Sequence, residues 1–260
     1  MKYLSRLKTL LWFLQKPVLY PQLLYLSYQR LYPHTKEQTR AVATQWCQEN
    51  CVSAAKAIED ITGVKYVMLF EELFEPYVKE AQKVVAKVPV KMGGSGDLAL
   101  LYYLSKYLEA TTIVESGVAY GWSSLALLLS LKNNEEGILY STDMPYPKMN
   151  NDDFVGCVVP QELKKKWRLI KLPDRLAFHK IEKCVTSIDI CHYDSDKSYR
   201  GRHWAYPKLW ALLRKGGLFI SDDINDNVAF MDFAVSIDEK PIIVYNEYEQ
   251  KYIGIISKSV

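Results

Sequence analysis

Residues 111–123 read TTIVESGVAYGWS, an apolar run that ends on Glu115 and leads into a loop with two glycines, Gly117 and Gly121. A buried β-strand followed by a glycine-containing turn and a helix is typical of the first unit of an open α/β sheet that binds a ligand. The loop lacks the third glycine of a dinucleotide-binding fingerprint, and it has neither the lysine nor the length of a P-loop. Taken alone, the two glycines are also consistent with a tight strand-to-helix turn that binds nothing.

The sequence after this stretch alternates between strand patterns and helical patterns. Further strands are predicted at 137–143, 166–172, 187–194 and 217–223, with helical segments between them. Residues 240–258 predict two strands joined by a tight polar turn, and therefore an antiparallel hairpin. The alternation predicts an α/β fold, namely a doubly wound, Rossmann-like sheet of seven strands that ends in a C-terminal antiparallel hairpin with edge character.

The first ninety residues do not follow this alternation. We expect residues 1–90 to form an N-terminal helical extension and residues 91–260 to form the cofactor-binding domain. Within the extension, apolar residues at helical spacing predict one helix over 36–62 that ends at Gly63, and a second helical pattern covers 71–87.

The segment up to residue 36 carries six Lys or Arg residues and no acid, and its apolar residues are large. Its longest apolar runs are far shorter than the roughly 18 residues that span a bilayer. A basic amphipathic segment of this kind could act as a lid over the site, form the face of a homodimer, or make peripheral contact with an anionic membrane surface. Packing or dimerisation is the expectation that we favour over membrane contact.

The overall composition narrows the functional class. The formal net charge is +3 over 260 residues, which gives no case for nucleic-acid binding. The five cysteines are an odd number without CxxC spacing, which argues against a disulfide framework and against a zinc cluster. The expected location is the cytoplasm, with the inner membrane face as a peripheral alternative.

Acidic residues stand at or just after the ends of the predicted strands. Ligands of open parallel sheets bind beyond the carboxyl ends of the strands, so this placement predicts a binding site there. The acids in question are Glu115, Asp143, Asp174, Asp194, Asp222 and Asp223.

The acids of the first three strands point to a nucleoside-containing cofactor. Asp143 can accept hydrogen bonds from both hydroxyl groups of a ribose. Ser123 opens the next helix, whose free N–H groups suit a carboxylate or a phosphate. Asp174 could reach an adenine amino group, or it could simply cap the helix that follows.

The remaining three acids form a second group. Asp194, Asp222 and Asp223 end two strands that should be neighbours, and three adjacent carboxylates repel one another unless a cation holds them. Oxygen ligands suit Mg²⁺, Mn²⁺ or Ca²⁺, although one acid could instead contact the cofactor or the backbone while the others face water. Lys197 could act as a base if its pKa is lowered, or it could only neutralise the aspartates.

Together these motifs resemble a known family. The block IVESGVAYGWSSLALLLSL resembles motif I of the class I S-adenosylmethionine-dependent methyltransferases, and LYSTDMP is similar to their ribose-binding second strand. The blocks VGCVVPQELKKKWRLIKLPD, ICHYDSDKSY and LRKGGLFISDDINDNVAFMDF resemble one branch of small-molecule methyltransferases, grouped with macrocin O-methyltransferase and cephalosporin-hydroxylase-like proteins. The resemblance covers residues 90–256.

The resemblance implies an enzyme that methylates an oxygen of a small hydroxylated acceptor, such as a sugar or a natural-product precursor. It implies that S-adenosylmethionine is bound by Glu115, Gly117, Gly121, Ser123 and Asp143, and Asp174 is a further candidate. By similarity to catechol O-methyltransferase-like enzymes, it also implies a Mg²⁺ site at Asp194, Asp222 and Asp223, with Lys197 and Asp194 as catalytic residues.

Several alternatives stay open on the sequence alone. The chain could be a nicotinamide-dependent oxidoreductase, although the missing third glycine and the closing hairpin count against this, or a cofactor-binding scaffold without turnover. His192 or His203 could serve as the base in place of Lys197. Tyr146 and Trp122 could cover the acceptor.

Overall fold

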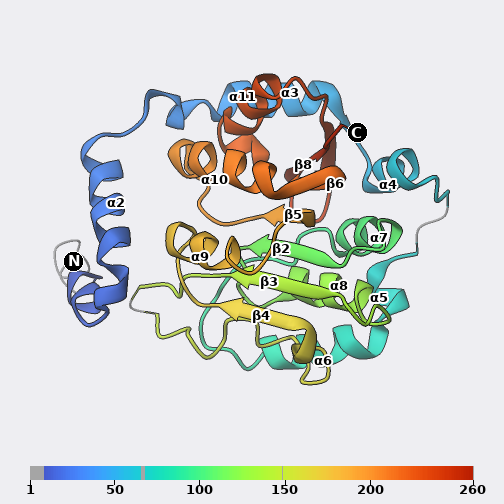
Figure 1. Cartoon of the computed structure of the whole chain (residues 1–260), viewed down its shortest axis with the longest axis horizontal. Coiled ribbons are helices and arrows are strands. Elements are labelled where there is room, and N and C mark those ends of the chain that lie inside the picture. Colours follow the sequence, from blue (N-terminus) through green and yellow to red (C-terminus); the bar gives the residue numbers. More distant parts are fainter. Residues whose placement is uncertain (1–8, 66–67, 148, 260) are drawn as a thin grey trace.

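The computed structural model describes residues 9–65, 68–147 and 149–259. Its centre is one eight-stranded sheet in the order β1-β7-β8-β6-β5-β2-β3-β4, around which the helices are arranged (Figure 1). Neighbouring strands are parallel, except that β8 is antiparallel to both β6 and β7. The predicted doubly wound α/β fold is therefore confirmed.

The seven predicted strands are present, and one short strand joins them. The strands are β1 (Cys51–Val52), β2 (Thr112–Ser116), β3 (Ile138–Thr142), β4 (Trp167–Ile170), β5 (Ile188–Tyr193), β6 (Leu213–Ser221), β7 (Ile242–Asn246) and β8 (Lys251–Ser257). The sheet has eight strands rather than seven because β1 pairs in parallel with β7. The C-terminal hairpin is antiparallel as predicted, but β8 lies inside the sheet, between β6 and β7, and not at its edge.

The helices lie between the strands in the predicted order. They are α2 (Tyr20–Leu31), α3 (Arg40–Asn50), α4 (Ala54–Thr62), α5 (Phe70–Leu73), α6 (Glu75–Val85), α7 (Leu98–Tyr107), α8 (Trp122–Ser130), α9 (Asp174–Ile181), α10 (Tyr199–Leu212) and α11 (Ala229–Ser236). Short 3₁₀ turns are formed by Pro17–Leu19, Thr35–Gln38, Lys164–Lys166 and Ile224–Asp226. Residues 9–14 are also helical.

Two apolar cores hold these layers together. One core joins the sheet to α4, α6, α7 and α8, and it contains Ala57, Ile58 and Phe70 from the N-terminal ninety residues. The other joins the sheet to α9, α10 and α11 and reaches Cys47 in α3. The N-terminal extension therefore shares the main core, and β1 makes it part of the same sheet.

The prediction of a single helix over 36–62 is wrong. The chain leaves the helical conformation after α3, forms β1, and starts α4 at Ser53, whose side chain accepts a hydrogen bond from the Lys56 backbone N–H. Apolar residues recur at helical spacing through both helices, so the sequence pattern hides the break. The pairing of β1 with a strand almost two hundred residues later supplies the reason for it.

Helix α2 lies to one side of the sheet, at the left of Figure 1. None of its residues is buried. In the part of the chain that the structure describes, no helix is both long enough and apolar enough to cross a membrane.

Candidate functional site

A cavity of about 330 Å³ opens beyond the carboxyl ends of β2, β3, β5 and β6. Its walls come from the loop after β2, from the residues that follow β3 and β5, and from the loop 93–96. Helix α2 contributes Gln22, Tyr25 and Leu26 to the lining. Open parallel sheets bind their ligands at this position.

The loop after β2 depends on its two glycines. Gly117 and Gly121 have φ angles of +95° and +96°, a conformation that other residues adopt only with strain. A Cβ atom on Gly117 would collide with the backbone carbonyl of Asp194, and a Cβ atom on Gly121 would lie 2.9 Å from the Cα of Gly156. Both positions of the loop therefore require glycine.

Glu115 shapes this loop from below and does not line the cavity. The carboxylate is fully buried. It accepts hydrogen bonds from the hydroxyl groups of Ser123 at 2.6 Å, Ser124 at 2.5 Å and Ser141 at 2.6 Å. Glu115 therefore ties β2 to β3 and to the start of α8.

Asp143 lines the cavity and also orders the loop. Its Oδ2 accepts hydrogen bonds from the backbone N–H groups of Val118 at 2.8 Å and Ala119 at 2.7 Å. Burial raises the pKa of Asp143 to about 6, against the opposing effect of these two hydrogen bonds. The residue expected to bind a ribose thus fixes the shape of the glycine loop as well.

Asp174 lines the cavity at the first turn of α9. Its Oδ1 accepts hydrogen bonds from Ser116 Oγ at 2.6 Å and Thr142 Oγ1 at 3.1 Å, and the hydroxyl of Tyr193 donates to Oδ2 at 3.3 Å. Burial raises the pKa of this carboxyl. The cap position of α9 is Pro173, so the alternative that Asp174 is the N-cap is wrong.

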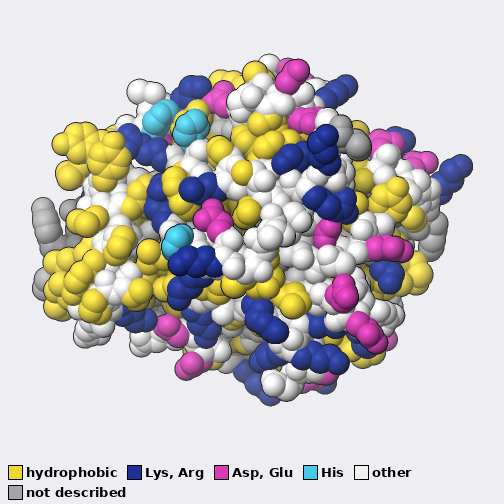
Figure 2. Space-filling model, viewed as in Figure 1, with side chains coloured by type: hydrophobic (Ala, Val, Ile, Leu, Met, Phe, Trp, Pro, Cys, Tyr) yellow, Lys and Arg dark blue, Asp and Glu magenta, His cyan; other side chains and the backbone are white. Residues whose placement is uncertain are grey.

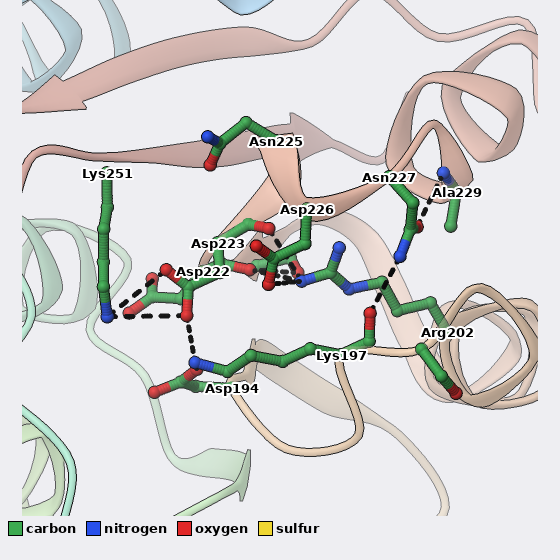
Figure 3. A network of polar contacts seen from close by, with 12 residues as sticks. Asp194, Lys197, Arg202, Asp222, Asp223, Asn225, Asp226, Asn227, Ala229 and Lys251 are labelled. Carbon is green, nitrogen blue, oxygen red and sulfur yellow. Dashed lines mark hydrogen bonds and ion pairs between the residues drawn. The ribbon is translucent and has the colours of Figure 1, made fainter. Parts of the chain in front are cut away.

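Two lysines lie beside the second group of acids, Asp194, Asp222 and Asp223, as Figure 3 shows. Lys197 Nζ forms ion pairs with Asp223 and, at 3.1 Å, with Asp194 Oδ1. Lys251 Nζ lies 3.3 Å from Asp223 Oδ1 and 3.2 Å from Glu249 Oε2. The carboxylates therefore have positively charged partners within the chain.

The divalent-metal site expected at Asp194, Asp222 and Asp223 is not formed. Within residues 9–65, 68–147 and 149–259, no group of three His, Cys, Asp or Glu side chains is arranged so that it could hold a metal ion. Lys197 and Lys251 both contact the Asp223 carboxylate, where a metal would have to bind. The residues present do not fit a metal, because two ammonium groups already supply the compensating charge.

The predicted role of Lys197 as a base stays a prediction, and the pKa of Lys197 does not favour it. Burial lowers the pKa of Lys197, but Asp194 and Asp223 outweigh this effect and hold the pKa well above its ordinary value. Lys197 is therefore an ammonium ion at neutral pH, and it neutralises the aspartates, which was the alternative. Burial and the nearby Asp222 raise the pKa of Asp194 to about 6, so at neutral pH Asp194 is a carboxylate able to accept a proton in this cavity, as is Asp143 beside the glycine loop.

His192 is buried at the lining of the cavity, between two carboxylates. Its Nδ1 is 3.8 Å from Glu115 Oε1 and its Nε2 is 3.7 Å from Asp222 Oδ1, distances of ion pairs rather than hydrogen bonds. Burial lowers the pKa of His192, but the two carboxylates raise it to about 10. The imidazolium links the glycine-loop side of the site to the turn after β6, and it is not available as a base.

Arg202 is a site residue that sequence reasoning missed. It is fully buried in α10. Its Nη2 donates hydrogen bonds to the backbone carbonyls of Asp222 at 3.2 Å and Asp223 at 2.8 Å, and Asp223 has a left-handed φ of +52°. Arg202 therefore holds the turn that presents both aspartates, and no local pattern in RGRHWAYP reveals this contact.

The loop 93–96 and Glu249 were also missed. The sequence predicts this loop but gives it no role, whereas it lines the cavity. The backbone N–H of Gly96 donates to Glu249 Oε1 at 2.9 Å, and a Cβ atom on Gly94 would collide with the same carboxylate. The three glycines of MGGSGD are the signal that a close contact was to be expected here.

The structure thus divides the predicted residues into two sets. Three form the support of the site and do not line the cavity, namely Glu115, Gly121 and Asp223. The cavity itself brings together Gly117, Ser123, Asp143, Asp174, Asp194, Lys197 and Asp222. Of the aromatic residues expected over the acceptor, Tyr146 lines the cavity and Trp122 does not.

Residues 114–224, which contain this site, match a family model described as a methyltransferase domain. This part of the chain is therefore similar to methyltransferase domains. The resemblance to the class I family is thereby confirmed, while membership of the macrocin branch stays a prediction. The comparison with curated proteins found no significant match.

Solved structures of methyltransferases share the fold of this domain. An O-methyltransferase from Bacillus cereus, in complex with S-adenosylhomocysteine, is 14% identical with a TM-score of 0.56, covering 82% of this chain and 100% of its own. A methyltransferase from Podospora anserina, also bound to S-adenosylhomocysteine, is 12% identical with a TM-score of 0.54 and coverages of 88% and 98%. An O-methyltransferase of tomaymycin synthesis from Streptomyces achromogenes, in complex with S-adenosylmethionine, is 12% identical with a TM-score of 0.52 and coverages of 87% and 100%.

Proposed function

We propose that the domain transfers a methyl group from S-adenosylmethionine to a hydroxyl oxygen of a small acceptor. The observation that carries the proposal is that one cavity is lined both by the glycine loop with Asp143 and by Asp194 with Tyr146. Cofactor and acceptor can therefore meet at a carboxylate that is able to take a proton. The Bacillus cereus and Streptomyces achromogenes structures, which contain S-adenosylhomocysteine and S-adenosylmethionine, support this choice of cofactor.

The residues of the glycine loop fit this cofactor. Gly117 leaves the space beside the Asp194 carbonyl free of a side chain, and Asp143 offers a carboxylate next to it. When bound, S-adenosylmethionine supplies an electrophilic methyl group on a sulfonium, and the protein's task is to position the two reactants. Asp143, Asp174 and Ser123 are the polar side chains that we assign to cofactor binding.

The acceptor hydroxyl is deprotonated by Asp194 in this proposal. The acceptor oxygen forms a bond to the methyl carbon while the carbon–sulfur bond breaks, its electron pair stays on sulfur, and the hydroxyl proton goes to the Asp194 carboxylate. The ammonium group of Lys197, 3.1 Å from Asp194 Oδ1, holds this carboxylate in place. No divalent metal takes part, because Lys197 and Lys251 occupy its expected position beside Asp223.

The acceptor is proposed to be a polar molecule with several hydroxyl groups, of the sugar or natural-product type. The cavity offers it Gln22 and Tyr25 of α2 together with Ser95 and Lys251. Tyr146, which is 39% exposed at the cavity wall, can pack against one face of such a molecule.

Turnover on a library of hydroxylated acceptors, measured as release of S-adenosylhomocysteine, tests the proposal. We expect product release with the wild-type chain and its loss in Asp194→Asn, whereas Asp238→Asn, an exposed acid outside the cavity, should behave as wild type. Binding of S-adenosylmethionine without turnover on any acceptor would favour the alternative of a cofactor-binding scaffold.

A further inference from the structure

Residues 10–32 form an exposed apolar surface beside the site. Ten of the eighteen large apolar side chains that are exposed in the described part of the chain belong to this short segment. Figure 2 shows apolar side chains gathered on the side of the molecule where α2 lies. Soluble proteins seldom leave so many large apolar residues together on one surface unless something covers them.

Helix α2 turns its polar side toward the protein. Tyr25 donates a hydrogen bond to Asp196 Oδ2 at 3.1 Å, and Gln29 donates one to Ser198 Oγ at 2.8 Å. The opposite side carries Leu24 and Leu31, which are 70% and 72% exposed. A helix that packs on a core has the reverse arrangement, so the apolar side of α2 is directed at something outside the domain.

The charge around this surface is positive. Residues 9–36 carry Lys16, Arg30 and Lys36 and no acid, although Lys16 pairs with Asp152 at 3.4 Å and Lys36 with Asp232 at 2.7 Å. A second cavity, of about 390 Å³, adjoins α2, and among the described residues that line it are two arginines and two histidines but no acid. The Arg200 guanidinium lies 4.6 Å from the ring centroid of Tyr28 on α2, and its Nε has no hydrogen-bond partner within the described chain.

An apolar helix face can be covered by a second copy of the chain or by a membrane, and the positive charge favours the membrane. In a symmetric contact between two copies of the chain, each basic segment would face its own duplicate, and the like charges would repel. An anionic membrane surface attracts them instead. Exposed leucines and tyrosines next to basic residues are also the composition of helices that lie in the membrane interface.

We propose that the apolar surface of residues 10–32 docks on an anionic membrane surface. Leu24 and Leu31 enter the boundary between headgroups and acyl chains, and the basic cavity beside Arg200 receives lipid phosphate. The docking is peripheral, and it does not depend on which acceptor the proposed methyl transfer uses.

Co-sedimentation of the full chain with lipid vesicles tests this proposal. We expect binding to vesicles that contain phosphatidylglycerol, weak binding to pure phosphatidylcholine, and a loss of binding as salt is raised. Leu24→Ser combined with Leu31→Ser should weaken binding by at least about tenfold, since two buried apolar side chains are lost. The matched control is Val42→Ser combined with Val235→Ser, which removes two exposed valines of α3 and α11, outside residues 10–32, and should change nothing.

A second variant tests the basic cavity. Arg200→Gln should weaken binding to the phosphatidylglycerol vesicles severalfold and leave the weak binding to phosphatidylcholine unchanged. The proposal is overturned if the full chain does not bind the anionic vesicles, or if the double leucine variant binds them as wild type does. It is equally overturned if sedimentation equilibrium shows a dimer that the leucine variant abolishes, with no vesicle binding, because a second copy then covers the surface.

Discussion

Replacing Glu115 by Gln should destabilise the protein much more at neutral pH than at high pH. The wild-type carboxylate is completely buried, accepts hydrogen bonds from three serine hydroxyls, and lies 3.8 Å from His192 Nδ1. Glutamine preserves the shape of the side chain, so the packing of β2 and β3 is kept. What is lost is one of the two negative charges that keep His192 protonated.

The magnitude follows from the pKa of His192. Burial alone would lower it, but Asp222 and Glu115 together raise it from 6.5 to about 10. Each pKa unit corresponds to about 1.4 kcal/mol, so at pH 7 the two carboxylates contribute roughly 4 kcal/mol through this proton, and Glu115 alone about 2 kcal/mol. A group whose pKa is raised on folding stabilises fully below its unfolded value near 6.5, and this contribution disappears as the pH rises through about 10.

Urea denaturation at pH 6, 8 and 10.5 measures the effect. We expect the difference in unfolding free energy between wild type and Glu115→Gln to be about 2 kcal/mol or more at pH 6, and to become much smaller at pH 10.5. Ser124→Ala is the control, since it removes one hydrogen bond to Glu115 without a change of charge and should cost about 1 kcal/mol at every pH. A Glu115→Gln effect that does not change with pH would refute the charged state assigned to His192.

Three further outcomes test the site. In Asp194→Asn, kcat should fall about 10²- to 10⁴-fold, and an active variant would exclude Asp194 as the base. The kcat of the wild type at saturating cofactor should fall about tenfold per pH unit below pH 6, because the Asp194 carboxylate, with a pKa of about 6, is then protonated. Methyl transfer should be unaffected by EDTA or added Mg²⁺, because lysines occupy the expected metal position, and strict metal dependence would contradict this. Gly117→Ala should weaken cofactor binding at least about tenfold in calorimetry, since its φ is +95° and its Cβ would meet the Asp194 carbonyl; unchanged affinity would place the cofactor elsewhere.

The sequence was sufficient for most of the fold because the strand signals are local. Runs such as TIVES and ICHY are apolar and bounded by turn residues, so the strand order along the chain and the closing hairpin could be predicted. The strand β1 could not, because its two residues lie within a continuous helical pattern. Only the pairing with β7, a contact between distant segments, makes them a strand.

The sequence located the site better than it assigned the roles within it. Acids at strand ends marked the right edge of the sheet, and Asp143 and Asp194 do line the cavity. Their partners come from far away in the chain, as with Lys251, which contacts Asp223. A local pattern cannot show whether a metal ion or a lysine neutralises a carboxylate, and this is why the contacts of Lys197 and Lys251 with Asp223 could not be predicted.

Calorimetric titration of the full chain with S-adenosylmethionine and with NAD tests the central claim most directly. We predict saturable binding of one S-adenosylmethionine per chain, competition by S-adenosylhomocysteine, and no heat of binding with NAD. Saturable binding of NAD without binding of S-adenosylmethionine would contradict the account and would favour a nicotinamide-dependent oxidoreductase.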